Sequence, residues 1–280
     1  MDHHFRAFSF VDRITAIEGG RRIRGHYAIP AGIDSFSPSL VGEAIGQIAA
    51  WAAMAAVDFT HRPVAGIVGG IDLTSTVRPG QRLELSADLD GVDTSAIAYS
   101  GTAQVEGSPV LRLERCVGPM VPVEEFDDPQ ALRERFALLS AAGAAPGAFG
   151  GMCPLIAHRG GGEPGRSVRA TLELPATASF FSDHFPRRPV FPGSLLVDQN
   201  LQLVAALAAE IPPPDNGGRW VARRLTGLKL RSFIPPGETL EFEARLVERS
   251  AGSATVKVET RRGTRLTGTA TILLGMEAYP

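Results

Sequence analysis

Two segments of the sequence each occur twice, and this internal repeat constrains the fold more than any other feature. Residues 77–85 (VRPGQRLEL) match residues 234–242 (IPPGETLEF) at an offset of 157. Residues 39–47 (SLVGEAIGQ) match residues 194–202 (SLLVDQNLQ) at an offset of 155. Because the two offsets differ by only two residues, the sequence predicts two copies of one structural unit in tandem.

Both copies contain runs of alternating apolar and polar residues. A period of two, interrupted by Gly and Pro turns, is typical of antiparallel strands. Each copy also contains one apolar helical segment, so we expect an α+β fold with a long helix on one face of an antiparallel sheet. The sheets of the two copies are expected to pair side by side. The expected strands cover residues 83–89, 96–105 and 110–116, then 240–246, 254–260 and 266–274.

An acidic residue followed four positions later by glutamine marks the helix of each copy. The pairs are Glu43 with Gln47 and Asp198 with Gln202. Residues four apart lie on one face of an α-helix, so each pair places two polar groups together in an apolar segment. The first of these segments, residues 40–57, is of marginal length for a membrane span and is interrupted by polar residues, so we expect a buried helix.

The chain length of 280 residues fits two units of modest size. Between the copies, Asp128 and Pro129 have the residue types of an N-cap and a first helical position, which predicts a short helix to about Ser140. A Gly- and Ala-rich segment follows it. We expect a first unit over residues 1–125, a linker over 126–151 and a second unit over 152–280.

Charge and cysteine content exclude several classes of protein. The net charge of -2 gives no general basic field for nucleic acid. The two cysteines, Cys116 and Cys153, lack metal-ligand spacing and suggest a reducing compartment. No basic region followed by an apolar run opens the sequence, so a secretion signal is not expected. These features predict a cytoplasmic protein without a metal ion, nucleic-acid partner or membrane.

The most specific motif runs from His184 to Asp198, HFPRRPVFPGSLLVD. It resembles the bacterial β-hydroxyacyl carrier-protein dehydratases, which have a hot-dog fold, a sheet wrapped around a central helix. Those enzymes carry His-Phe, Pro-Val and Pro-Gly pairs, with an acidic residue fourteen positions after the His. The resemblance implies a double hot-dog chain. It departs from the family at Asp183 and Arg187, where the family has Gly.

The first copy lacks the histidine of this motif. The position fourteen before Glu43 is Ile29, and Ser37-Pro38 replaces the Pro-Gly pair. In the resembled family the His and the acid of one site come from different subunits. The resemblance therefore implies one site per chain, in which His184 faces Glu43, with Asp198 as the competing acid.

The chemistry of dehydration requires a base, an acid and a donor. A neutral imidazole such as His184 can take the proton beside the thioester carbonyl, since histidine titrates near neutrality. A carboxyl group in an apolar tunnel can protonate the departing hydroxyl. Gly193 is expected to begin the second helix, where its free N–H would face the thioester oxygen.

Further residues are candidates for binding substrate or carrier. Gln47 and Gln202 lie one helical turn from the acids, and Phe185 and Pro192 belong to the motif. Basic side chains at the expected tunnel mouth could dock an acidic carrier protein or the phosphate of a pantetheine arm. These are Arg187, Arg188, Arg219, Arg223 and Arg224.

The resemblance implies an (R)-3-hydroxyacyl thioester dehydratase that forms a trans-2-enoyl product in fatty-acid, polyketide or related synthesis, without a cofactor. Its substrate would be an acyl-carrier-protein or coenzyme A thioester. Two alternatives stay open: an acyl thioesterase, because fold does not fix function, and a non-catalytic partner subunit of a dehydratase. We expect a monomeric pseudo-dimer or a homo-oligomer of it.

Overall fold

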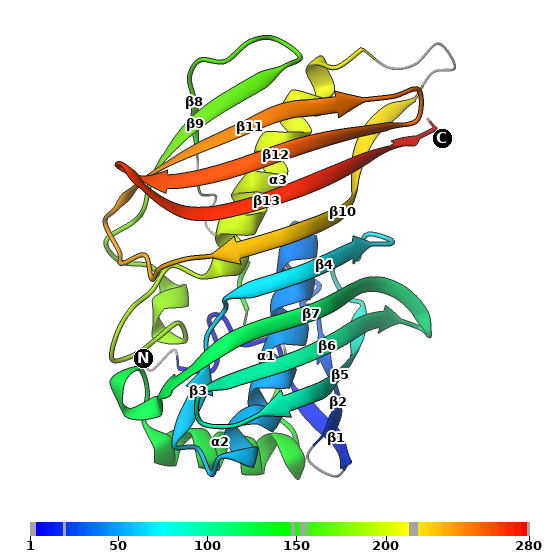
Figure 1. Ribbon diagram of the computed structural model, residues 1–280. Helices are drawn as coiled ribbons and strands as arrows, with labels where there is room; N and C mark the ends of the chain where they lie inside the picture. The colour runs from blue at the N-terminus through cyan, green and yellow to red at the C-terminus, as the bar shows by residue number, and fades with distance from the viewer. Residues whose placement is uncertain are drawn as a thin grey trace.

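The computed structural model describes residues 4–18, 21–146, 149–151, 155, 157–212 and 218–278. Cys153 and the expected start of the second unit at residue 152 lie outside these ranges. The described chain forms one large sheet with two long helices behind it (Figure 1). The helices are α1 (Pro38–Ala56) and α3 (Gly193–Glu210), and they pack against each other and against the sheet.

The first half of the chain supplies one half of this sheet. Its strand order is β1-β2-β5-β6-β7-β4, and every neighbouring pair is antiparallel. A short strand, β3, pairs with the end of β7. The bounds are β1 (Arg13–Glu18), β2 (Arg22–Ala28), β3 (His61–Pro63), β4 (Ile67–Leu73), β5 (Arg82–Val92), β6 (Ala96–Val105) and β7 (Ser108–Pro122).

The second half repeats this order as a mirror along the sheet, β10-β13-β12-β11-β9-β8. The two halves join where β4 and β10 pair antiparallel, with Leu228 opposite Val68. The expected side-by-side pairing of two helix-and-sheet units is therefore present. The bounds are β8 (His158–Arg159), β9 (Ser167–Glu173), β10 (Arg219–Leu230), β11 (Thr239–Arg249), β12 (Ser253–Arg262) and β13 (Arg265–Glu277).

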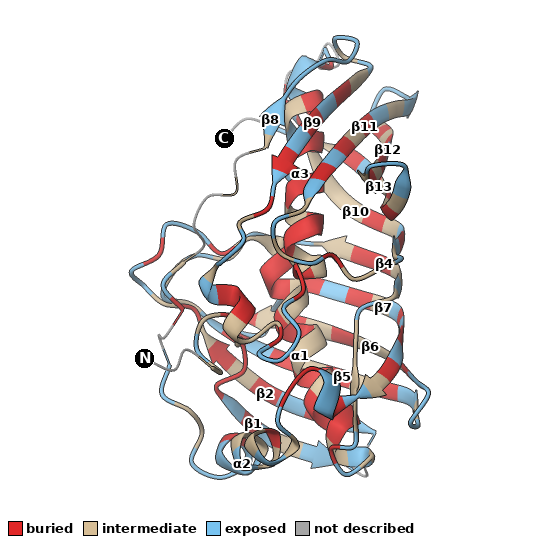
Figure 2. Cartoon of the chain, turned by 90° about the vertical axis from the view of Figure 1, so that its left-hand side faces the viewer, coloured by how far each residue is buried: buried red, intermediate tan, exposed pale blue. Residues whose placement is uncertain are grey.

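The core lies between the two long helices and the inner face of the sheet. Figure 2 shows buried positions on α1 and α3 and alternating buried and exposed positions along the strands. Helix α1 is long and apolar enough, by length and composition alone, to cross a membrane. However, 61% of its most apolar 18-residue stretch is buried within the protein. It packs against β2, β5 and β6 as the core helix of the first unit.

Shorter helices complete the first unit and the loop of the second. Helix α2 (Pro129–Ser140) begins as expected, because the Asp128 side chain accepts hydrogen bonds from the N–H groups of Gln130 and Ala131. Two 3-10 helices, η1 (Val123–Glu125) and η2 (Ser179–Ser182), lie before α2 and before His184. The division into units at residues 125 and 151 stays a prediction.

Candidate active site

The loop that carries His184 is longer than its counterpart in the first unit. It joins β9 to α3 over residues 174–192, whereas the corresponding loop of the first unit joins β2 to α1 over residues 29–37 and is ten residues shorter. Backbone hydrogen bonds hold the long loop in place. Phe191 N–H donates to Ile234 O at 2.7 Å, and His184 N–H donates to Phe180 O at 3.0 Å.

The imidazole of His184 is held in one tautomer. Its Nδ1 lies 3.0 Å from the Val190 carbonyl oxygen. A carbonyl can only accept, so the proton is on Nδ1 and the lone pair of Nε2 is free. The ring stacks on Phe185 with centroids 4.1 Å apart, and its edge meets Phe8 at 6.0 Å. Burial lowers the pKa of His184, and the nearby charge of Glu43 opposes that effect.

Glu43 projects from α1 and is fixed by its neighbour one turn along. Gln47 Nε2 donates to Glu43 Oε1 at 3.0 Å and to Phe8 O at 2.8 Å. Gln47 Oε1 accepts from Phe10 N–H at 2.7 Å. The Gln47 amide is therefore held by the N-terminal segment and in turn holds the Glu43 carboxylate.

A cavity of about 480 Å³ lies between the two long helices and the central strands. This volume is within the range of small-molecule sites. Its wall is mainly apolar and includes five of the expected site residues: Glu43, Gln47, His184, Phe185 and Gly193.

The other acid of the repeat lies outside the cavity wall. Asp198 Oδ1 accepts from Ser39 Oγ at 3.2 Å, and Asp198 Oδ2 accepts from Gln202 Nε2 at 2.7 Å. Gln202 is exposed, and Ile29, the counterpart of His184, is buried. The structure thus brings Glu43, and not Asp198, to the cavity that His184 lines.

Gly193 is the first residue of α3, as expected. The N–H groups of a first helical turn have no partner within the helix and lie at the positive end of its dipole. A Cβ here would lie 2.4 Å from Leu230 Cδ1, so the Leu230 side chain or the start of the helix would have to shift. Pro192 lies just before the helix, and its carbonyl accepts from the N–H groups of Leu195 and Leu196. Pro192 itself is not part of the cavity wall.

Asp183, which replaces a family Gly, ties the N-terminal segment to the site. Its carboxylate accepts from Phe8 N–H at 2.6 Å, from Ser9 Oγ at 3.1 Å and from Phe5 N–H. Burial raises the pKa of Asp183, and these hydrogen bonds oppose that rise. The sequence marked Asp183 only as a departure; its partners, far away in the sequence, gave no local signal.

Arg62 is a second residue of the cavity wall that the sequence did not indicate. It lies on β3, a strand of three residues, and forms an ion pair with Asp127 at 3.2 Å. Its guanidinium carbon lies 3.7 Å from the centroid of the Phe185 ring. A strand this short shows no alternation from which a buried arginine could be predicted.

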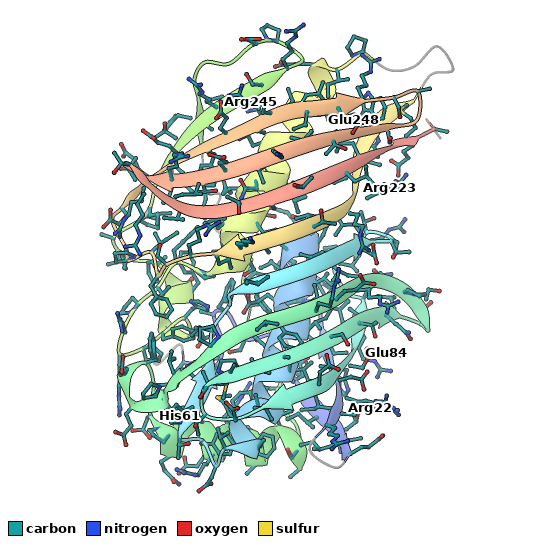
Figure 3. All side chains as sticks on the ribbon, viewed as in Figure 1. Arg22, His61, Glu84, Arg223, Arg245 and Glu248 are labelled. Atoms are coloured by element: carbon teal, nitrogen blue, oxygen red, sulfur yellow. The ribbon has the colours of Figure 1, made fainter. Side chains whose placement is uncertain are left out.

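The arginines expected at a tunnel mouth do not lie together. Arg187 and Arg188 pair with Asp128 and Glu125 at 3.0 and 3.2 Å. Arg219, Arg223 and Arg224 belong to β10, where each pairs with acidic residues. Figure 3 shows Arg223 in the N-terminal half of β10. All five arginines lie in the part of the chain that the structure describes, and none of them lines the cavity. Docking of a carrier through them stays a prediction.

The residues that both line the cavity and are exposed identify its opening. They are Ala65, Ile67, Val117, Pro119 and Arg231. These positions lie together, because Ile67 of β4 is opposite Val117 of β7 and also opposite Lys229 of β10. Arg231 follows two residues after Lys229. The mouth therefore has an apolar rim with two cations on one side.

Comparison with known proteins identifies the family. The family described as ApeI-like, ApeI dehydratase, matches residues 162–268. A 3-hydroxyacyl-[acyl-carrier-protein] dehydratase FabZ from Variovorax paradoxus is 30% identical over 117 residues, which are 41% of this chain and 77% of that protein. The chain belongs to this hot-dog dehydratase family. A FabZ from Albidiferax ferrireducens is 33% identical over 92 residues, 32% of this chain, and the chain spans 61% of its length.

Solved structures extend the family's fold to the whole chain. An oleoyl thioesterase from Lactobacillus plantarum covers 95% of this chain and 99% of its own, with a TM-score of 0.61 and 9% identity. A MaoC-like dehydratase covers 92% and 98%, with a TM-score of 0.53 and 12% identity. At such identities the likeness concerns the fold alone. The expected double hot-dog architecture is confirmed.

The cavity wall contains two groups that are able to exchange protons. An imidazole with a free Nε2 and a braced carboxyl group line the same apolar cavity, beside a helix N-terminus. Within the described ranges, no group of three or more His, Cys, Asp or Glu residues is arranged to hold a metal ion.

Proposed function

We propose that the chain dehydrates (R)-3-hydroxyacyl thioesters to trans-2-enoyl thioesters. The observation that carries this proposal is the pairing of His184, from the second unit, with Glu43, from the first, at one cavity. The family supplies the stereochemistry. Membership of a hot-dog family of dehydratases and thioesterases makes an acyl thioester the expected substrate class.

In the proposed reaction, Nε2 of His184 takes a proton from C2 of the substrate. The electron pair left on C2 forms the C2–C3 double bond as the C3–O bond breaks, and Glu43 gives a proton to the departing hydroxyl, so that water leaves. Negative charge develops on the thioester oxygen in between. The Gly193 N–H and the positive end of α3 would stabilise that charge.

The mouth of the cavity suits a pantetheine arm. Its apolar rim, Ile67 and Val117, is exposed at 47% and 45%, so the apolar part of the arm could lie against these two side chains. Lys229 and Arg231 beside that rim would bind the phosphate of the arm. We infer that the acyl group of a carrier-protein or coenzyme A thioester enters here. A cytoplasmic location, with the Cys116 thiol free, is part of the proposal.

The test is hydration of crotonyl-coenzyme A, the reverse reaction, compared with thiol release from the same compound and from acyl-coenzyme A. The proposal predicts loss of the enoyl absorbance without thiol release. It also predicts that His184→Asn abolishes this hydration. Thiol release without hydration would instead indicate a thioesterase. If His184→Asn leaves product formation in the cell unchanged, the chain is a non-catalytic partner subunit.

A further inference from the structure

Arg62 is a buried cation of the first unit that contacts the catalytic loop of the second. It lies on β3 opposite Val121 of β7, and its side chain is 12% exposed. Removing a guanidinium from water is costly unless the protein compensates for it. The groups that contact the Arg62 guanidinium therefore indicate which interactions offset the cost of its burial.

The compensation for this burial is incomplete. Arg62 Nη1 lies 3.2 Å from Asp127 Oδ2, and the Asp127 side chain is 3% exposed. Asp127 is itself fixed by the Asp128 N–H at 2.8 Å and by His4 at 3.4 Å. The Nε atom of Arg62 is buried without a hydrogen-bond partner among the described residues. An ion pair with a purely structural role would use more of the guanidinium N–H groups. The ion pair alone therefore does not account for the position of Arg62.

Stacking accounts for the rest of that position. The guanidinium lies over the Phe185 ring at 3.7 Å, and the same ring stacks on His184 at 4.1 Å with an angle of 22° between the planes. Arg62, Phe185 and His184 thus form a continuous series of contacts from one unit to the other. A cation over an aromatic ring is a favourable contact, more so away from water.

Arg62 also acts on His184 through its charge. Burial has the largest effect on the pKa of His184 and lowers it. The charge of Glu43 and the hydrogen bond to Val190 raise it, and the charge of Arg62 on β3 lowers it by a smaller amount. The other charged groups nearby are engaged elsewhere. Asp183 is bonded to the N-terminal segment, Asp127 pairs with Arg62 and His4, and Arg135 of α2 lies near Phe5.

We propose that Arg62 is a positioning residue that holds the His184 ring in place through Phe185 and whose charge, together with burial, favours the neutral imidazole. The inference rests on the proposed role of His184 as the base. It explains why a first unit without a catalytic histidine retains a buried arginine at this cavity.

The test compares Arg62→Met, Arg62→Lys and the control Arg133→Met by NMR titration of His184 and by pH profiles. Arg133 also combines an ion pair, with Asp58, and an aromatic ring, that of Phe59, but its side chain is 39% exposed and does not line the cavity. In Arg62→Met we expect the His184 titration and the acid limb of kcat/KM to move to higher pH. We also expect kcat to fall about tenfold with a smaller change in KM, because the base is misplaced.

Arg62→Lys keeps the charge, so its His184 titration should stay near that of the wild type while part of kcat is lost. Arg133→Met should change neither. The proposal fails if folded Arg62→Met titrates as the wild type does, or if Met and Lys have the same effect. If Arg62→Met does not fold, Asp127→Asn decides: the uncompensated cation should move the titration to lower pH, and an unchanged titration overturns the proposal.

The titration needs no substrate, so the two proposals can fail separately. A shifted His184 titration in a protein that dehydrates no thioester would overturn the proposed function and retain the effect of Arg62. If the protein dehydrates thioesters but the His184 titration is unshifted in Arg62→Met, the proposed function is retained and the proposed role of Arg62 is overturned.

Discussion

The helices α1 and α3 carry matching acid–glutamine pairs in matching local geometry. Gln47 donates to Glu43 at 3.0 Å, and Gln202 donates to Asp198 at 2.7 Å. What differs is what packs against each helix. Gln47 is also bonded to the N-terminal segment and Glu43 lines the cavity with His184, whereas Gln202 is exposed. The environment of the repeated motif, rather than the motif itself, therefore distinguishes the acid that lines the cavity from the acid that does not.

The helices differ also in the space that they leave. Gly42 and Gly46 of α1 occupy the positions that Val197 and Leu201 occupy in α3. Gly46 lies close to Tyr99, whose hydroxyl would be 3.4 Å from a Cβ at that position. Both glycines line the cavity, together with Tyr99 and Cys116. We therefore expect the acyl chain to lie along α1, in the unit that lacks the histidine.

Loss of His184 is expected to have the largest effect. In His184→Asn, dehydration should fall roughly 100-fold to 10,000-fold, because no other described side chain of the cavity offers a neutral base. The measurement is kcat/KM for a 3-hydroxyacyl thioester. The control is His158→Asn, which changes an exposed histidine of β8. Retention of more than about a tenth of the activity would contradict the role of His184.

Replacement of Gly193 should have the next largest effect. In Gly193→Ala the new Cβ lies 2.4 Å from Leu230 Cδ1, so either the Leu230 side chain or the start of α3 must shift. Alanine keeps the N–H, so we expect kcat to fall by up to about 100-fold only to the extent that the shift moves this donor away from the thioester oxygen. Gly252→Ala is a control, because a Cβ there meets nothing. A lower melting temperature with unchanged kcat would assign Gly193 a packing role only.

Gly46→Leu transfers the residue of the second copy to the first. The added side chain should obstruct the cavity beside Tyr99 and reduce activity toward long acyl chains about tenfold relative to short ones, by lost apolar burial. Ala56→Leu, at the exposed end of α1, is the control. An equal loss for long and short chains would show that the acyl chain lies elsewhere.

The smallest expected effect concerns stability at mildly acidic pH. Because burial lowers the pKa of His184 in the folded protein, protonation favours the unfolded chain. The stability contributed by neutral His184 is therefore present above its unfolded pKa of about 6.5 and is lost as the pH falls toward the lower folded value. Denaturant titrations at decreasing pH should show a smaller loss of the free energy of unfolding in His184→Asn than in the wild type. An equal loss in both proteins would assign the acid sensitivity to other groups.

The repeat allowed much of the fold to be predicted. The expected strand over residues 96–105 is β6 itself, and the expected short helix from Pro129 to Ser140 is α2. Strands β4 and β10, which join the units, were not expected, because their role depends on pairing with each other across the chain. Local patterns cannot report such long-range contacts.

The site was predictable only where a motif carried it. His184, Glu43 and Gly193 stand out in the sequence by their spacing, and all three line one cavity. Arg62 has no such signal, since it is buried by contacts with Asp127 and Phe185 that are remote in the sequence. The mouth at Arg231 is likewise defined by neighbouring strands and not by a cluster of arginines in the sequence.

The comparison of the two helices is tested most directly by measuring kcat for Glu43→Gln and Asp198→Asn side by side on a 3-hydroxyacyl thioester. Each variant removes one carboxylate and keeps its hydrogen-bonding shape. We predict a loss of about 100-fold or more in Glu43→Gln, as for a general acid, and little change in Asp198→Asn. A large loss in Asp198→Asn with a nearly active Glu43→Gln would contradict the account.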